Sequence, residues 1–170
     1  MSYVNSLLRV IGERAPVDPH DIEVDVNNHP VHPFRSVADA EQTASTFLRA
    51  CQFYSLKYIE PGGAPGEVGL QRVHSLVALL FGYSQWPDLV RDIRQKLHAS
   101  YFDENGSPEA LHRKFADRLA PRLVHLDAGR IYWALRTSGF GCGPERRKLG
   151  HQIMDLYQCE TFEQWHKLET

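Results

Sequence analysis

The sequence predicts a mainly α-helical protein, a bundle of short helices with an irregular N-terminal segment. Three observations lead to this prediction. Apolar residues recur at spacings of three and four along most of the chain, capping residues precede several of these stretches, and short segments rich in Gly or Pro separate them. The chain has 170 residues, 42% hydrophobic and 24% charged, which suffices for one domain or two small ones without disulfides or metals.

The first part of the chain is predicted to be a helix followed by irregular structure. Ser2 can cap a helix whose apolar positions follow the helical rule as far as Gly12. Residues 15–34 contain four prolines, which favour extended chain and turns. The alternation of Ile, Val and Val within residues 22–26 predicts at most one short strand there.

A second helix and a break in the chain follow. Ser36, with Asp39 three positions later, has the form of a capping box and predicts a helix over residues 37–52. Residues 53–59 are rich in β-forming residues but ambiguous, and residues 61–66, Pro-Gly-Gly-Ala-Pro-Gly, interrupt any regular structure. We therefore expect an N-terminal helical unit with a Pro-rich loop over residues 1–60 and a helical bundle over residues 67–170, with a single compact domain as the alternative.

Six helices are predicted in the second unit, several with clear start signals. Ser107 precedes a proline at the first helical position, Asp127 precedes an apolar run, and Thr161 with Gln164 forms another capping box. The predicted ranges are 67–81, 85–98, 108–120, 128–138, 144–157 and 162–169.

Two passages in this unit resemble each other, with the pattern aromatic-x-Gln-Trp-x-x-Leu. Each follows an amphipathic helix that carries a histidine, so a duplicated helix-turn-helix over residues 67–98 and 144–170 is one interpretation. Gly82 can end one helix in the left-handed conformation, and the aromatic side chains after it can plug the corner between two helices. The residues given this structural role are Gly82, Tyr83, Trp86 and Leu89 in the first passage and Phe162, Trp165 and Leu168 in the second.

The first passage carries a family resemblance. Residues 77–89 read Val-Ala-Leu-Leu-Phe-Gly-Tyr-Ser-Gln-Trp-Pro-Asp-Leu, and His74-Ser75 stands just before them. This segment resembles the glyoxalase-related protein domain, a small helical module of bacterial and mobile-element proteins. The resemblance implies a helical hairpin and a bacterial or mobile-element setting, and it implies no glyoxalase chemistry.

Histidines raise the question of a metal site. His29-x-x-His32, with one histidine and two aspartates upstream, is the densest group of metal-ligating residue types. Prolines beside both histidines indicate an irregular exposed loop, and no further ligand stands at a fixed helical offset. We therefore predict no metal and no cofactor, and keep His29 and His32 as the candidates.

One arrangement of residues resembles a catalytic motif. Arg91-Asp92 followed by His98 is similar to the Arg-x(4 to 6)-His motif of HEPN ribonucleases, in which the guanidinium contacts the scissile phosphate and the imidazole acts on the 2'-hydroxyl. A chain with this many Arg and His residues holds roughly two such spacings by chance. We predict no catalytic residues, with Arg91 and His98 as the candidates.

A Gly-rich loop precedes the helix predicted at 144–157. Gly141 and Gly143 flank Cys142, which we expect to be exposed near the positive end of that helix. Arg146, Arg147 and Lys148 in the first turn oppose the helix dipole, and a bound phosphate or acidic partner would resolve this conflict. The loop lacks the Gly-Lys-Ser/Thr of a P-loop, so we predict an anion-binding or partner-binding surface.

Composition and these motifs together favour a binding role. The three cysteines form no CxxC pair, no apolar run approaches a membrane span, and the net charge of −2 argues against non-specific nucleic-acid binding. We expect a cytoplasmic, non-enzymatic adaptor that engages a protein partner and does not enter a membrane. The alternatives are a nucleic-acid-binding or RNA-processing protein, and a small-molecule sensor with a pocket lined by Trp86, Tyr132 and Trp133.

Overall fold

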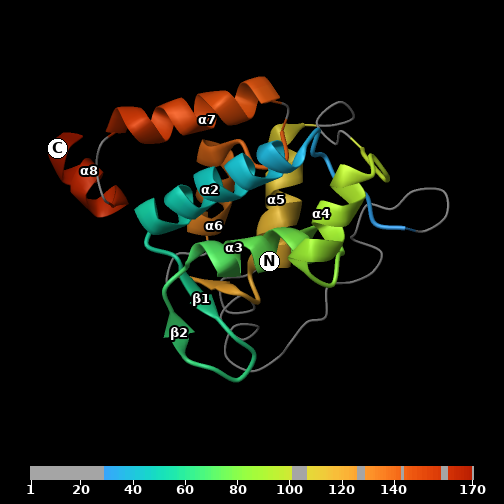
Figure 1. Ribbon diagram of the computed structural model, residues 1–170. Coiled ribbons are helices and arrows are strands. Elements are labelled where there is room, and N and C mark those ends of the chain that lie inside the picture. Colours follow the sequence, from blue (N-terminus) through green and yellow to red (C-terminus); the bar gives the residue numbers. More distant parts are fainter. Residues whose placement is uncertain (1–28, 101–106, 126–128, 143, 158–160, 170) are drawn as a thin grey trace.

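The computed structural model describes residues 29–100, 107–125, 129–142, 144–157 and 161–169. Over these ranges the protein is mainly α-helical, as predicted, with seven helices and a three-stranded antiparallel sheet at one end (Figure 1). The helix expected after Ser2 and the strand expected within residues 22–26 lie outside the described residues. The helices are α2 (Val37–Phe53), α3 (Leu70–Leu80), α4 (Trp86–Arg94), α5 (Pro108–Leu119), α6 (Gly129–Ser138), α7 (Pro144–Tyr157) and α8 (Phe162–Glu169).

The small sheet uses part of the chain that sequence reasoning treated as a break. Strand β1 (Lys57–Ile59) pairs with β2 (Pro65–Gly66) on one side and with β3 (Leu123–Val124) on the other. The segment between β1 and β2 is therefore the loop of a hairpin, in which Gly62 takes a φ of 76° and the amide of Gly63 donates to the carbonyl of Glu60. Strands of two and three residues are too short to leave an alternating pattern in the sequence.

One hydrophobic core includes residues on both sides of this hairpin. Its centre is a group of phenylalanines: Phe140 packs against Phe47, Phe81 and Phe115, at ring-centroid distances of 4.9, 6.0 and 5.9 Å. These side chains come from α2, from the ends of α3 and α6, and from α5. Helix α2 contacts α3, α6 and α7, and so lies at the middle of the bundle (Figure 1).

Local capping signals place most helix ends correctly. The hydroxyl of Ser107 accepts from the amide of Ala110, and Thr161 and Gln164 form a reciprocal capping box with bonds of 3.1 and 3.2 Å. The amide of Asp39 donates to the Ser36 hydroxyl, as expected of the capping residue of α2. Helices α7 and α8 have the predicted bounds.

The end of α4 was predicted wrongly. The helix stops at Arg94 instead of continuing to residue 98, because Lys96 and His98 take left-handed backbone angles, with φ of 56° and 57°. The amide of His32 donates to the carbonyl of His98, and the amide of Ser100 donates to the carbonyl of His32. Backbone pairing with a distant segment therefore replaces the last helical turn.

The corner between α3 and α4 has the predicted form. Gly82 has a φ of 83°, and the amides of Gly82 and Tyr83 donate to carbonyls in the last turn of α3. Tyr83 and Leu89 are buried, and Trp86 stacks on His74 with 4.1 Å between ring centroids. In the second passage Phe162 packs against Phe53 and Tyr54, whereas the side chains of Trp165 and Leu168 lie outside the described part of the chain.

Helices α6 and α7 approach each other closely at Gly150. A Cβ atom built on Gly150 would lie 2.4 Å from the carbonyl oxygen of Ser138 and 2.7 Å from that of Thr137. Only glycine fits this contact, so Gly150 sets the distance between the two helices.

We therefore predict that Gly150→Ala lowers the free energy of unfolding by about 1–3 kcal/mol, although the same change in an exposed helix stabilises by about 1 kcal/mol. Urea denaturation measures the effect. Gly69→Ala is the control: no atom lies within 4 Å of a Cβ there, and the change should cost less than about 1 kcal/mol, from the weaker N-cap of α3 alone. A variant Gly150→Ala as stable as the wild type would contradict the close packing of α6 on α7.

Candidate functional site

The Gly-rich loop does not present the cationic surface that its sequence predicts. Arg147 is buried, and its Nη2 donates to Asp39 Oδ1 over 2.5 Å while its Nη1 donates to the carbonyl of Cys142. Of the three basic residues, only Lys148 is exposed. The anion that the sequence analysis required at this helix end is therefore an internal one, the carboxylate of Asp39.

Gly141 is also fixed by packing. It has a φ of 72°, and a Cβ there would lie 2.7 Å from the ring of Phe115. Gly143 lies outside the described residues. The described part of the loop, up to Cys142, is thus tightly packed.

Cys142 is buried, contrary to the expectation that it is exposed. Its Sγ lies 3.6 Å from His112 Nε2, and the same nitrogen lies 2.7 Å from the carbonyl oxygen of Phe140. Since a carbonyl only accepts, Nε2 carries the proton and cannot take one from the thiol. Burial lowers the pKa of His112 to about 4, so the ring is neutral near pH 7. The Cys142–His112 pair therefore lacks the arrangement of a nucleophile with its base.

A pocket of about 310 Å³ opens between the end of α2 and helices α6 and α7. Two of its residues, Arg136 and Arg146, each bond to another residue of the chain through Nη2. Arg136 Nη2 donates to Glu109 Oε1 over 3.3 Å, and Arg146 Nη2 donates to the carbonyl of Arg136. Their Nη1 atoms are buried and have no hydrogen-bond partner among the described residues. The lining residues are Phe53, Tyr54, Trp133, Arg136, Thr137, Arg146 and Ile153.

The electrostatics of this pocket favour an anion. Burial lowers the pKa of the Arg146 guanidinium; Arg136 lowers it further, and Cys142 opposes the change. Two guanidinium groups with spare donors thus lie close together in a partly dry, aromatic environment. A carboxylate or phosphate placed there would reduce their mutual repulsion and accept from both Nη1 atoms.

Apolar side chains border the pocket on its solvent side. Trp133 is 55% exposed, and on α7 Leu149 and Leu156 are 48% and 77% exposed. The last two lie one helical turn before and after Ile153, which lines the pocket. We call the pocket together with Trp133, Leu149 and Leu156 the α6–α7 surface. Of the residues expected to line a sensor pocket, Trp133 lines it, whereas Trp86 stacks on His74 and Tyr132 packs near Arg113.

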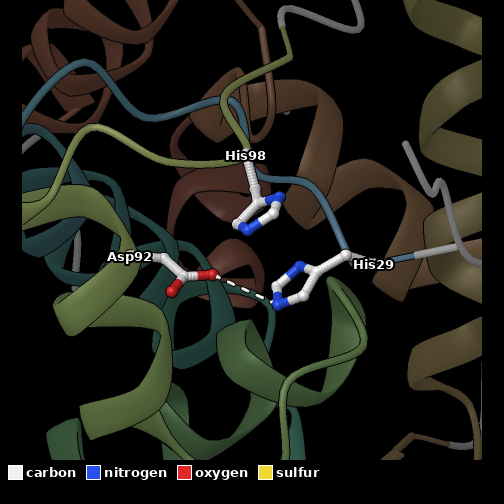
Figure 2. A group of neighbouring side chains, drawn as sticks. All are labelled: His29, Asp92 and His98. Atoms are coloured by element: carbon white, nitrogen blue, oxygen red, sulfur yellow. Dashed lines mark ion pairs between the residues drawn. The ribbon is translucent and has the colours of Figure 1, made fainter. Parts of the chain in front are cut away.

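The candidate metal and catalytic residues are paired differently from the prediction. His29 lies against His98, with the rings stacked at 3.6 Å, and beside Asp92 (Figure 2). His32 is buried and bonded to the carbonyl of Leu97 and the amide of Phe34.

The candidate catalytic residues do not lie on one helix. The exposed Arg91 forms an ion pair with Asp88. Because α4 ends before residue 98, Arg91 and His98 do not share a helix face.

Comparisons with known proteins identify no family. No protein-family model matches the chain, and the searches of curated proteins and of solved structures found no similar protein. None of the described helices has the length and apolar character needed to cross a membrane.

The role of Arg147 can be tested by removing its side chain. Arg147→Ala leaves the Asp39 carboxylate without its cation in a site where both side chains are less than 20% exposed. We expect the free energy of unfolding to fall by about 3–5 kcal/mol. The exposed neighbour provides the control, since Lys148→Ala should change it by less than about 0.5 kcal/mol. Equal effects of the two substitutions would show that Arg147 faces solvent.

The buried His112 predicts a pH dependence of stability. Because its pKa is lowered from 6.5 to about 4, the unfolded chain binds a proton between these pH values and the folded chain does not. The contribution of neutral His112 is complete above pH 6.5 and falls by up to roughly 3 kcal/mol as the pH drops to 4. In His112→Gln this part of the pH dependence disappears, which urea denaturation at pH 7 and pH 4.5 detects. His166→Gln, at an exposed histidine, should keep the wild-type pH dependence.

Proposed function

We propose that this chain is a binding protein that engages a protein partner through the α6–α7 surface, with an acidic side chain of the partner entering the pocket. The observation that carries the proposal is the pair of buried Nη1 atoms of Arg136 and Arg146, which have no hydrogen-bond partner within the described ranges, in a pocket that the exposed Trp133 also lines. Tryptophan and arginine are the residues that most often dominate the binding energy of protein interfaces.

The apolar border of the pocket supports a macromolecular partner. Leu149 and Leu156 are exposed outside the pocket itself, where a ligand small enough to be enclosed would not cover them. An interface that covers the pocket and both leucines would bury Trp133 and the leucines together with two arginines, and aromatic residues and arginine are enriched at protein–protein contacts.

The distribution of charge supports a protein over a nucleic acid. Several arginines of the described residues pair with acidic side chains: Arg49 with Asp155, Arg130 with Glu163, and Arg147 with Asp39. Arg91, the candidate for phosphate contact, pairs with Asp88. Nucleic-acid binding depends on cations that can neutralise several phosphates at once.

The setting of this activity rests on the sequence. A cytoplasmic location follows from the odd number of cysteines and the lack of a CxxC pair in the sequence, and the bacterial or mobile-element setting follows from the resemblance at residues 74–89. Both are part of the proposal.

The proposal predicts where a partner can be cross-linked. A photoreactive benzoylphenylalanine in place of Trp133 should capture one protein specifically in host cells, whereas the same group in place of Leu70, 48% exposed on α3, should not. With the captured protein purified, Trp133→Ala should weaken its binding by about 2 kcal/mol, roughly thirtyfold, in calorimetry. Leu70→Ala should bind like the wild type. Identical cross-linking from both positions would refute the assignment of the surface.

A small anionic molecule is the second candidate occupant, because about 310 Å³ lies at the lower end of the usual range for ligand pockets, about 300–1,000 Å³. The variant Leu156→Ala separates the two functions. It should weaken binding of a protein that covers α7, and it should leave binding of a small molecule inside the pocket unchanged.

A further inference from the structure

A second group of side chains, none of which lines the pocket, has the composition of a metal site. Figure 2 shows His29 and Asp92 pointing toward each other, with the ring of His98 above that of His29. One ligand atom from each of the three residues lies within 4.8 Å of the other two. The sequence suggested His29 and His32 as ligands of one metal ion. The fold instead places His29 beside Asp92 of α4 and His98 of the loop that follows α4.

The Asp92 carboxylate is the strongest indication that this group is a cation site. Its side chain is 7% exposed, and its Oδ2 is buried without a hydrogen-bond partner among the described residues. His29 Nε2 lies 3.8 Å from this oxygen, too far for a hydrogen bond. A buried carboxylate oxygen normally has a partner, because removing its charge from water is costly.

The protonation of His29 directs a lone pair at this carboxylate. His29 Nδ1 lies 2.7 Å from the carbonyl oxygen of Pro30, which can only accept, so Nδ1 carries the proton. In the neutral ring Nε2 is then unprotonated and faces Asp92 Oδ2. Two electron-rich atoms facing each other need a proton or a metal ion between them. A bond from the other ring nitrogen to a backbone carbonyl is also the usual support of a metal-binding histidine.

The backbone around the group is fixed independently of any metal. The amide of His32 donates to the carbonyl of His98 over 3.0 Å, and His32 Nε2 donates to the carbonyl of Leu97 over 2.8 Å. These bonds hold the left-handed turn at His98 next to the segment that carries His29. The scaffold is therefore in place, and binding requires movement of side chains alone.

We propose that His29, Asp92 and His98 bind a divalent transition-metal ion of the zinc type. Two imidazoles and one carboxylate suit Zn²⁺ better than Ca²⁺ or Mg²⁺, which take mainly oxygen ligands. Zinc bond lengths place tetrahedral ligand atoms about 3.4 Å apart, so the outermost pair, now within 4.8 Å, closes by at most about 1.4 Å. The rings unstack so that both lone pairs meet the ion, and the 41% exposure of the His29 side chain leaves room for this rotation. Three protein ligands leave the fourth position for water or a further ligand.

The test is Zn²⁺ binding to the full chain without a histidine tag, measured by calorimetry with metal chloride alone. The expected result is one Zn²⁺ per chain for the wild type and for the control His166→Gln, whose histidine lies on α8. Each of His29→Gln, Asp92→Asn and His98→Asn should weaken binding by at least about tenfold. Asparagine is chosen at position 98 because it tolerates the left-handed backbone there.

The variants must be folded for this comparison, which circular dichroism and the melting temperature without metal establish. His29→Gln carries the test if Asp92→Asn is unstable, since His29 is partly exposed. Zinc should also raise the melting temperature of the wild type more than that of His29→Gln. Undetectable binding to the wild type, or equal binding to the wild type and to all three variants, would overturn the proposal.

Discussion

The buried ion pair between Arg147 and Asp39 fixes the orientation of α7 and, through it, the rest of the α6–α7 surface. Arg147, Gly150 and Met154 form the inward stripe of this helix. With that stripe turned toward α2 and α6, Arg146 and Ile153 necessarily face the pocket, and the exposed leucines come to border it. A rotation of the helix by one residue would turn Arg146 toward α2 in place of Arg147. The ion pair is costly to bury, and its role is in specifying this one orientation.

Local signals in the sequence were sufficient to predict most of the helices and several of their ends. Helix starts at Ser107 and Thr161 were predictable because a capping hydroxyl acts on amides two or three residues away. Gly82 was predictable because a left-handed residue at a helix end excludes most side chains. The end of α4 was not predictable in this way. The backbone of His98 leaves the helix to pair with His32, a residue more than sixty positions earlier.

The site was predicted less well, for a related reason. In sequence, Arg146, Arg147 and Lys148 are equivalent, and only the rotation of α7 decides that Arg147 is buried, Arg146 lines a pocket and Lys148 is exposed. The spacing of Arg147 from Gly150 and Met154 carried this information, since small and apolar residues three and seven positions away mark an inward face. The pairing of His29 with Asp92 and His98 had no comparable signal, because it depends on contact between a Pro-rich segment and a loop distant in sequence.

We propose that Arg136 and Arg146 bind an anion in the pocket, whereas Arg147 is already neutralised by Asp39 inside the protein. Nitrogen-15 NMR of the arginine side chains, during titration with 3-phenylpropionate as a carboxylate on an aromatic body, tests this claim directly. We predict that the nitrogen-15 chemical shifts of the Arg136 and Arg146 guanidinium groups change saturably with ligand concentration, and that those of Arg147 stay unchanged. Absence of shifts at Arg136 and Arg146, or a shift of Arg147 as large as theirs, would contradict it.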